Sequence, residues 1–289
     1  MNCNSCPRKC DIDRDTTLGF CNSPERFRVA RAALHFWEEP CISGTKGSGT
    51  VFFSGCNLRC VYCQNYEISS ENKGVQISDE KLIAVFDNLI AQGAHNINLV
   101  NPTHYAPQLA RVLSRWHSPV PIVYNTSGYE SVKTLRMLDG LVDIYLTDFK
   151  YSRPEKAKLY SRASDYPAVA KDALCEMRRQ IPTDIFNGDL MQKGVIIRHL
   201  ILPSNTNSSL EILDYLAEKY ADTYLSLMAQ YTPCGDLASH PELTRRITPR
   251  EYNKVVDYAL SKGFEKLFLQ ELTSADKNFI PPFDFTGVM

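Results

Sequence analysis

The sequence predicts an α/β protein with a partial or closed (βα)6-type parallel barrel and a short cysteine-containing N-terminal extension. The main observation is that apolar runs alternate with amphipathic segments from residue 50 onward, as in repeated strand–helix units. A second is that 289 residues with 44% hydrophobic composition suffice for one large core. We expect two parts, an extension over residues 1–49 and a barrel domain over residues 50–289.

Residues 1–49 show no sustained periodicity and end in the turn-rich segment 43–49, so a loop is expected to lead into the first strand. Continuous apolar runs then predict buried parallel strands. These strands are expected at residues 50–54, 97–101, 121–125, 143–149, 195–202 and 224–229, with residues 266–271 as a candidate seventh.

Helices are expected between these runs. An apolar stripe at helical spacing predicts a helix that begins near Ser78 and ends at Gly93. Capping boxes at 208–211 and 248–251 predict two more helices, over about 208–220 and 249–262. In such a fold the polar segments after the strands gather at one face, where chemistry is expected.

Composition narrows the class of protein. A formal net charge of -1 gives no field that would collect a polyanion, so no nucleic acid partner is expected. The charged, cysteine-bearing start does not resemble an export signal, and no apolar run is long enough to span a membrane. These features predict a cytoplasmic protein, whose ten cysteines favour metal binding or catalysis over disulfides.

The first expected strand leads directly into a loop with three cysteines, Cys56, Cys60 and Cys63. Thiolates are the usual ligands of iron-sulfur clusters, and three of them leave one iron of a 4Fe-4S cluster open. A zinc site would need a distant fourth ligand, and unligated buried cysteines are the other alternative. We therefore predict a 4Fe-4S cluster at this loop.

This loop, with Tyr62 just before the last cysteine, resembles the signature of radical S-adenosylmethionine enzymes. The resemblance covers residues 50 to about 272 and is nearest to the pyruvate formate-lyase activating enzyme branch, within a group that carries an extra N-terminal cysteine motif. It implies a TIM-barrel-like oxidoreductase in which the open iron binds S-adenosyl-L-methionine. One electron then cleaves the sulfonium to methionine and a 5'-deoxyadenosyl radical. Asn57 and Arg59 would shape the loop, and Tyr62 would sit near the adenine or pack in the core.

The same resemblance suggests cofactor contacts at the strand ends. The branch carries Gly-Gly-Glu after its second strand, but here the glutamate is missing, which leaves Asn101 and Thr103 as neutral acceptors for the ammonium group. The further expected cofactor contacts are Asn125, Ser127, Asp148, Lys150 and Arg198.

Some of these residues have a structural alternative. Asp148 and Lys150 share a strand face and could form an ordinary ion pair. His199 is expected to be a core histidine with both nitrogens hydrogen-bonded. Gln230, Tyr231 and Cys234 are candidates for substrate contact.

Three functions remain open. The first is a radical enzyme that abstracts hydrogen from a peptide, protein or small molecule. The second is an activase that installs a glycyl radical on a partner enzyme, and the third is a non-catalytic iron-sulfur or zinc module. The first two need a one-electron reductant such as flavodoxin or ferredoxin.

A second cysteine group lies in the extension and comprises Cys3, Cys6, Cys10 and Cys21. Four thiols within nineteen residues can complete the coordination of a second metal site, either an auxiliary iron-sulfur cluster or zinc. Four free thiols on a mobile arm are the alternative.

Overall fold

The computed structural model describes residues 3–270, 272 and 281–289. Within them one ten-stranded sheet has the order β10-β9-β8-β6-β5-β4-β2-β1-β3, with β7 paired to β8. Its parallel strands are β2 (Ser48–Phe53), β4 (Ile97–Val100), β5 (Ile122–Thr126), β6 (Ile144–Asp148), β8 (Leu190–Leu200), β9 (Tyr224–Met228) and β10 (Leu267–Leu269). The antiparallel strands are β1 (Phe27–His35), β3 (Val75–Ile77) and β7 (Ile185–Asn187).

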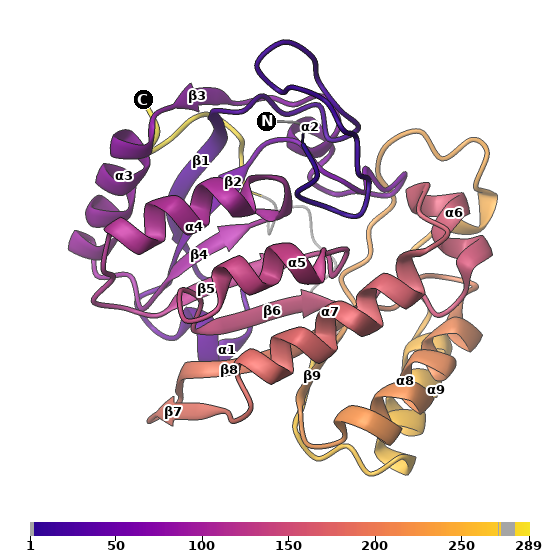
Figure 1. Cartoon of the computed structure of the whole chain (residues 1–289). Coiled ribbons are helices and arrows are strands. Elements are labelled where there is room, and N and C mark those ends of the chain that lie inside the picture. The colour runs from indigo at the N-terminus through magenta and orange to yellow at the C-terminus, as the bar shows by residue number, and fades with distance from the viewer. Residues whose placement is uncertain (1–2, 271, 273–280) are drawn as a thin grey trace.

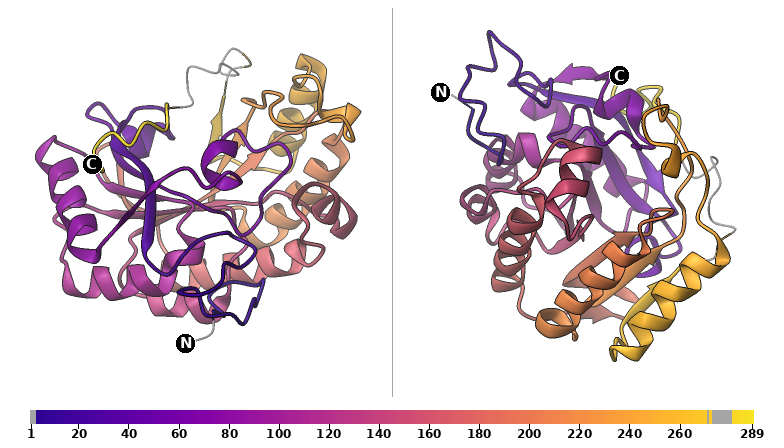
Figure 2. Two further views of the ribbon diagram at one scale, coloured as in Figure 1. Left: turned by 90° about the horizontal axis from the view of Figure 1, so that it is seen from above. Right: turned by 90° about the vertical axis from the view of Figure 1, so that its right-hand side faces the viewer.

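The longer helices cover the outer face of this sheet, whereas the short helix α1 packs on its other face. Figures 1 and 2 show α3, α4, α5 and α7 in a row along one face, while α8 and α9 lie together beside β9. The α-helices are α1 (Pro40–Ser43), α2 (Tyr66–Ser69), α3 (Asp79–Ala91), α4 (Ala106–Arg115), α5 (Val132–Leu135), α6 (Pro154–Ser161), α7 (Tyr166–Gln180), α8 (Thr206–Tyr220) and α9 (Pro249–Ser261). The 3-10 turns are η1 (Thr103–Tyr105), η2 (Arg136–Leu138) and η3 (Pro241–Leu243).

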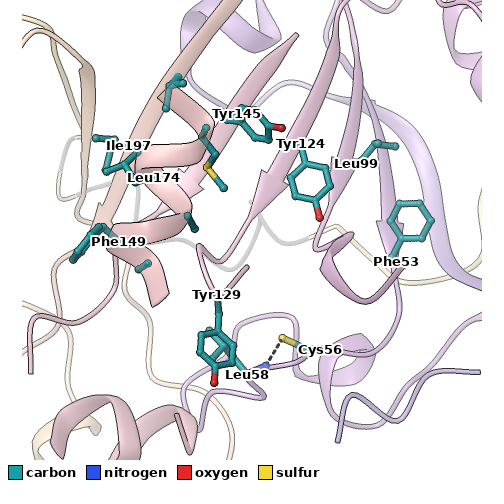
Figure 3. Close-up of a cluster of buried hydrophobic side chains, with 14 of the residues drawn as sticks. Phe53, Cys56, Leu58, Leu99, Tyr124, Tyr129, Tyr145, Phe149, Leu174 and Ile197 are labelled. Carbon is teal, nitrogen blue, oxygen red and sulfur yellow. Dashed lines mark hydrogen bonds between the residues drawn. The ribbon is translucent and has the colours of Figure 1, made fainter. Parts of the chain in front are cut away.

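The α/β fold class is confirmed, and the sheet is an open one. β3 and β10 form the two ends of the strand order, so the parallel strands make a partial barrel that does not close in the described part of the chain. All residues of β2 and of β5 are buried, as expected for parallel strands covered on both faces. Figure 3 shows the core that they share, with Phe53, Leu99, Tyr124 and Tyr145 side by side.

The expected elements are present with small shifts. Ser78 accepts a hydrogen bond from the Lys81 amide and caps α3, and Thr248 with Glu251 forms the capping box of α9. The candidate seventh strand is β10, although Glu271 lies outside the described residues.

One strand was missed and one sequence expectation is wrong. No strand was predicted within residues 1–49, yet β1 spans nine residues and pairs antiparallel with β2. The capping box at 208–211 does not form, because α8 begins two residues earlier, after Asn205, and Glu211 instead pairs with Arg153. The boundary at residue 49 stays a prediction.

In the residues described, no helix combines the length and the apolar character needed to cross a membrane.

Candidate metal centre and active site

The loop that follows β2 brings Cys56, Cys60 and Cys63 to one cavity of about 150 Å³. Gly55 opens the loop with a φ of 87°, and a Cβ there would lie 2.7 Å from the Cys21 carbonyl oxygen and closer still to the Ser23 hydroxyl. Only glycine combines this backbone conformation with such a close approach. The tight turn thus directs the cysteines away from the strand and into the cavity.

Hydrogen bonds fix the shape of this loop. Asn57, expected to shape it, donates from Nδ2 to the Tyr129 carbonyl at 2.8 Å. Figure 3 shows the Leu58 amide donating to the Cys56 sulfur, a contact of 3.3 Å, with Tyr129 packed beside Leu58. The Ser161 hydroxyl donates to the Cys60 sulfur at 2.9 Å. Such donors stabilise negative charge on sulfur ligands and tune their potential.

Arg59, the other residue expected to shape the loop, has a left-handed φ of 48°. Its guanidinium donates to the Phe20 carbonyl at 3.4 Å and lies over the Phe20 ring. The loop is therefore tied to the N-terminal extension as well as to the barrel.

The cavity fits the expected iron-sulfur cluster. Burial raises the pKa of the Cys56 thiol to about 12 and that of Cys63 to about 11, and the neighbouring Cys60 adds to both shifts. Thiolates are therefore costly here unless a metal balances their charge. The Ser127 hydroxyl lines the same cavity, buried and without a hydrogen-bond partner among the described residues, as expected of a group that awaits a ligand.

A single zinc ion suits this site poorly. The described lining holds neither a histidine nor a fourth cysteine. No three Cys, His, Asp or Glu side chains of the described chain are grouped to hold one ion. Three thiolates in one cavity instead suit an iron-sulfur cluster, which takes cysteine ligands on several irons.

A charged cluster from the strand ends forms the wall opposite the cysteines. Arg198, on β8, donates from Nε to Asp148 at 2.9 Å, from Nη1 to Glu38 at 3.2 Å and from Nη2 to Asn125 at 2.6 Å. Lys150 donates to the other oxygen of Asp148 at 2.5 Å. Burial opposes the ionisation of Asp148, but Lys150 and Arg198 outweigh it and lower the pKa of this carboxyl. The ion pair of Asp148 and Lys150 thus exists, and both residues also line the cavity.

A second cavity, of about 240 Å³, adjoins the first and shares with it Cys60, Cys63 and the charged wall. It extends past Tyr62, whose hydroxyl lies 2.6 Å from that of Tyr151, to Gln230. His35, Trp37, Phe52, Gln64 and Pro281 complete much of its lining. Polar and aromatic groups together can hold an organic molecule beside the cysteines.

Of the remaining residues predicted to contact cofactor or substrate, some line the cavities and others do not. Asn101 lines the cysteine cavity, and its Nδ2 donates to the Gly55 carbonyl at 2.5 Å. Thr103 is not among the lining residues, because its hydroxyl donates to the buried Glu130. Tyr231 donates to the Leu243 carbonyl at 2.7 Å, and Cys234 to the Tyr62 carbonyl at 3.2 Å. Both lie behind the cavity wall and outside its lining.

His199 is the core histidine that the sequence predicts. Its ring nitrogens lie 2.7 Å from the Phe149 carbonyl and 2.8 Å from the Ser209 hydroxyl. Burial lowers its pKa to about 4, so the ring is neutral.

Glu38 is the main site residue that sequence reasoning missed. It follows β1, lines the larger cavity and accepts hydrogen bonds from Asn98, Asn125 and Arg198. Burial raises its pKa despite Arg198. Because the sequence showed no periodicity in residues 1–49, β1 was not predicted, and Glu38 could not be assigned to the end of a strand. An acidic pair, Glu38 and Glu39, beside aromatic Phe36 and Trp37 was the available signal.

The four N-terminal cysteines, Cys3, Cys6, Cys10 and Cys21, line a separate small cavity together with Arg8, Arg14 and His104. The extension therefore gathers its thiols beside the barrel, in contact with the segment after β4.

Comparison with known proteins gives a family match and a relative. The family model described as Radical SAM superfamily matches residues 50–188. An uncharacterized protein of Methanocaldococcus jannaschii is 29% identical over 277 residues, which cover 92% of this chain and 77% of that protein.

Two solved structures have a similar fold at low identity. Streptococcus suis SuiB bound to S-adenosylmethionine has a TM-score of 0.51 and 11% identity, over 76% of this chain and 49% of that one. The FeFe-hydrogenase maturase HydG from Carboxydothermus hydrogenoformans has a TM-score of 0.51 and 15% identity, over 80% of this chain and 56% of that one. This chain spans about half the length of these two proteins, and the likeness concerns the fold alone.

Proposed function

We propose that this chain is an enzyme that cleaves S-adenosylmethionine reductively to abstract hydrogen from an organic substrate. The proposal starts from the match of residues 50–188 to the Radical SAM superfamily model. One observation carries the proposal. Cys56, Cys60 and Cys63 share a cavity with a buried cluster of opposite charges at the strand ends. Three thiolates leave one iron of a 4Fe-4S cluster open, and this iron would bind the cofactor and supply the electron that breaks its carbon–sulfur bond.

The residues of this wall suit the polar ends of an amino acid. Arg198 and Lys150 provide donors for a carboxylate, and Asn101, Asn125 and Glu38 provide acceptors for an ammonium group. Glu38 thereby supplies a carboxylate near the place where the expected glutamate after the second strand is missing. Ser127 offers a hydroxyl that bonds no atom of the described residues.

The larger cavity is the proposed substrate space. It lies between the cysteine loop and His35, Trp37, Phe52 and Gln230. Its aromatic and amide groups suit a peptide or small organic molecule. The same chemistry would serve the alternative role, installing a glycyl radical on a partner protein. The reductant is proposed to be a one-electron carrier such as flavodoxin or ferredoxin.

Cofactor cleavage tests the proposal. Anaerobically reconstituted, reduced protein is expected to convert S-adenosylmethionine to 5'-deoxyadenosine and methionine, measured by chromatography. Cys60→Ala is expected to abolish the product and to remove the iron and sulfide of this site, because a thiolate ligand is lost. Cys175→Ala, at an exposed cysteine, is the control and should behave as the wild type.

No product from fully loaded wild-type protein under strong reductant would contradict the proposal and would favour a non-catalytic module. Equal product from wild type and Cys60→Ala would contradict the ligand assignment. With a deuterated candidate substrate, deuterium in 5'-deoxyadenosine would identify the hydrogen donor. A radical on the backbone of a partner protein, seen by electron paramagnetic resonance, would identify the activase role.

A further inference from the structure

The four N-terminal cysteines are held in place although their segment contains no helix or strand. The Cys3 amide donates to Ile12 and the Asp11 amide to Cys3, which closes the segment into a loop. Cys6 and Cys21 are buried, while Cys3 and Cys10 are partly exposed. Thr134 of α5 donates to the Ser5 carbonyl at 2.7 Å and ties the loop to the barrel, beside the helices of that face (Figure 2). These hydrogen bonds hold the cysteine segment against the barrel.

Two arginines supply positive charge around the thiols. Arg14 is 4% exposed and donates to the carbonyls of Ser23, Pro24 and His104. Its carboxylate partner, Glu25, is 4.0 Å away with a side chain 45% exposed, so little negative charge balances this buried guanidinium. Arg8 lines the same cavity and lies over the Phe20 ring at 3.8 Å. Arg14, a buried cation without a close counter-charge, favours an anionic group in the cavity, and the partly exposed Arg8 adds positive charge.

His104 gives an independent sign of a ligand. It is 1% exposed, lines the cavity, and its Nδ1 has no hydrogen-bond partner among the described residues. Its other nitrogen lies 2.8 Å from the Ser54 carbonyl and acts as the donor to it. The lone pair on Nδ1 is therefore unused, which is rare for a buried nitrogen.

The spacing of the thiols distinguishes between metals. Four sulfurs around one zinc ion at about 2.3 Å lie only about 3.8 Å from one another. No three Cys, His, Asp or Glu side chains in the described ranges are grouped to hold a single ion. The four thiols line one cavity together, and four thiolates are the usual ligand set of an iron-sulfur cluster.

This second cavity is joined to the first by the backbone. The Cys56 amide donates to the Cys21 carbonyl at 3.3 Å, and Ser23 donates to the Ser54 carbonyl at 3.2 Å. Arg8 donates to the Asn57 carbonyl at 2.7 Å. A path of a few covalent bonds and one hydrogen bond thus connects the Cys21 sulfur to the Cys56 sulfur.

The position of the two sites suggests a division of labour. On the proposed function, cofactor and substrate fill the cavities beside Cys60 and Cys63 and block that side. Cys3 and Cys10 are partly exposed, so an electron carrier can approach them from another side.

We propose that Cys3, Cys6, Cys10 and Cys21 hold a second iron-sulfur cluster that relays single electrons to the cluster at Cys56, Cys60 and Cys63 through the Cys21–Cys56 hydrogen bond. A one-electron protein donor reduces the second cluster. That cluster is then reoxidised as the electron passes to the first. The relay rests on the proposed function, whereas the presence of the second cluster does not.

Metal and sulfide analysis tests the site. The triple variant with Cys56, Cys60 and Cys63 changed to alanine is expected to retain about four irons and four sulfides per chain, against about eight of each in the wild type. Cys10→Ala, at a partly exposed position, should lose the second cluster and keep the first, with circular dichroism as the check on folding. Cys175→Ala is the matched control. Zinc without sulfide in the triple variant, or neither metal, would overturn the second cluster.

Electron transfer tests the relay separately. With flavodoxin as reductant, Cys10→Ala is expected to form 5'-deoxyadenosine more slowly than wild type by at least an order of magnitude. With a strong chemical reductant the two rates should agree. In the reduced wild type, magnetic coupling between the clusters should broaden the paramagnetic resonance signal, and Cys10→Ala should show the unbroadened signal of one cluster. Equal rates with flavodoxin would overturn the relay, and no product with any reductant would instead contradict the proposed function.

Discussion

The polar side chains of this cavity are of two kinds. Some are already hydrogen-bonded to other protein groups, and others have no such bond and can bind a ligand. Arg198 uses three of its nitrogens on Asp148, Glu38 and Asn125. Removing it would leave buried carboxylates with less positive charge, so an alanine variant would mix lost stability with lost binding. Ser127 is the opposite case, since its buried hydroxyl bonds no described protein atom.

Ser127→Ala is therefore expected to weaken S-adenosylmethionine binding by about 1 kcal/mol, the net value of one hydrogen bond. The free energy of unfolding should not fall, because no internal bond is lost. Isothermal titration calorimetry on the anaerobic, cluster-loaded protein measures the first quantity, and urea unfolding measures the second. An unchanged affinity would remove Ser127 from the cofactor contacts.

The buried carboxyl of Glu130 is expected to make the stability of the fold depend on pH. Its carboxyl is buried among the hydroxyls of Thr103, Thr126 and Tyr124, and burial raises its pKa to about 7 from an ordinary value of 4.5. Between these values the unfolded chain releases the proton and the folded chain keeps it. The contribution of Glu130 is therefore complete below pH 4.5 and is lost as the pH rises through 7.

Glu130→Gln, which mimics the protonated acid, should remove this loss. Relative to the variant, the wild type is expected to lose about 3 kcal/mol of unfolding free energy between pH 4.5 and 7.5. Urea unfolding of both proteins at equal cluster loading gives this difference, and the shared histidine contributions cancel. If the unfolding free energies of the wild type and of Glu130→Gln changed equally with pH, the Glu130 carboxyl would already be ionised in the folded protein.

At the scale of elements, helices and strands that depend on residues close together in the sequence could be predicted. Elements that depend on contacts with residues far away in the sequence could not. The continuous apolar strands and the α9 capping box follow from local chemistry, and the structure confirms them. β1 was missed because its register shifts between Val29 and Arg31, and this irregularity breaks the alternation that identifies a strand. The cap of α8 was misplaced because Ser208 bonds Ser152 and Glu211 bonds Arg153, partners far away in sequence.

In the candidate site, too, the residues that follow from local sequence could be predicted, and those placed by contacts between distant segments could not. The cysteine spacing predicts the metal loop, and the strand-end rule indicates Asn125, Asp148 and Arg198, which all line the cavity. Glu38 could not be predicted in this way, since its place depends on the antiparallel pairing of β1 with β2. Thr103 follows β4 as expected, but the 3-10 turn η1 directs it to Glu130.

At the scale of the whole molecule, segments distant in sequence meet at the edge of the sheet beside the cavity. The Ala32 amide donates to Thr286 and the Phe285 amide to Ala30, so residues 285–286 lie along β1. A Cβ on Gly287, with φ of 72°, would lie 2.1 Å from the Ala32 carbonyl oxygen, which explains the glycine. The C-terminal segment thus supports the same strand that leads into Glu38.

Phe283 is the apolar anchor of this segment. It is 4% exposed and packs edge-on against Phe52 at 5.6 Å, in a small cluster with Ala30 and Ile68. Phe52 lines the larger cavity and Ile68 the smaller one, so the anchor lies directly behind both. Loss of the ring would leave a hole there that the neighbouring side chains fill incompletely.

Phe283→Ala is expected to lower the free energy of unfolding by about 3 kcal/mol, as for other buried phenylalanines. Because Phe52 and Ile68 can then shift, S-adenosylmethionine affinity should also fall although Phe283 itself lines neither cavity. Met289→Ala, at a residue 81% exposed in the same segment, is the control and should change neither quantity. Urea unfolding and calorimetric titration give the two values. A stability loss with full affinity would show that the C-terminal segment supports the sheet without shaping the cavity, whereas unchanged stability would contradict the packing against Phe52.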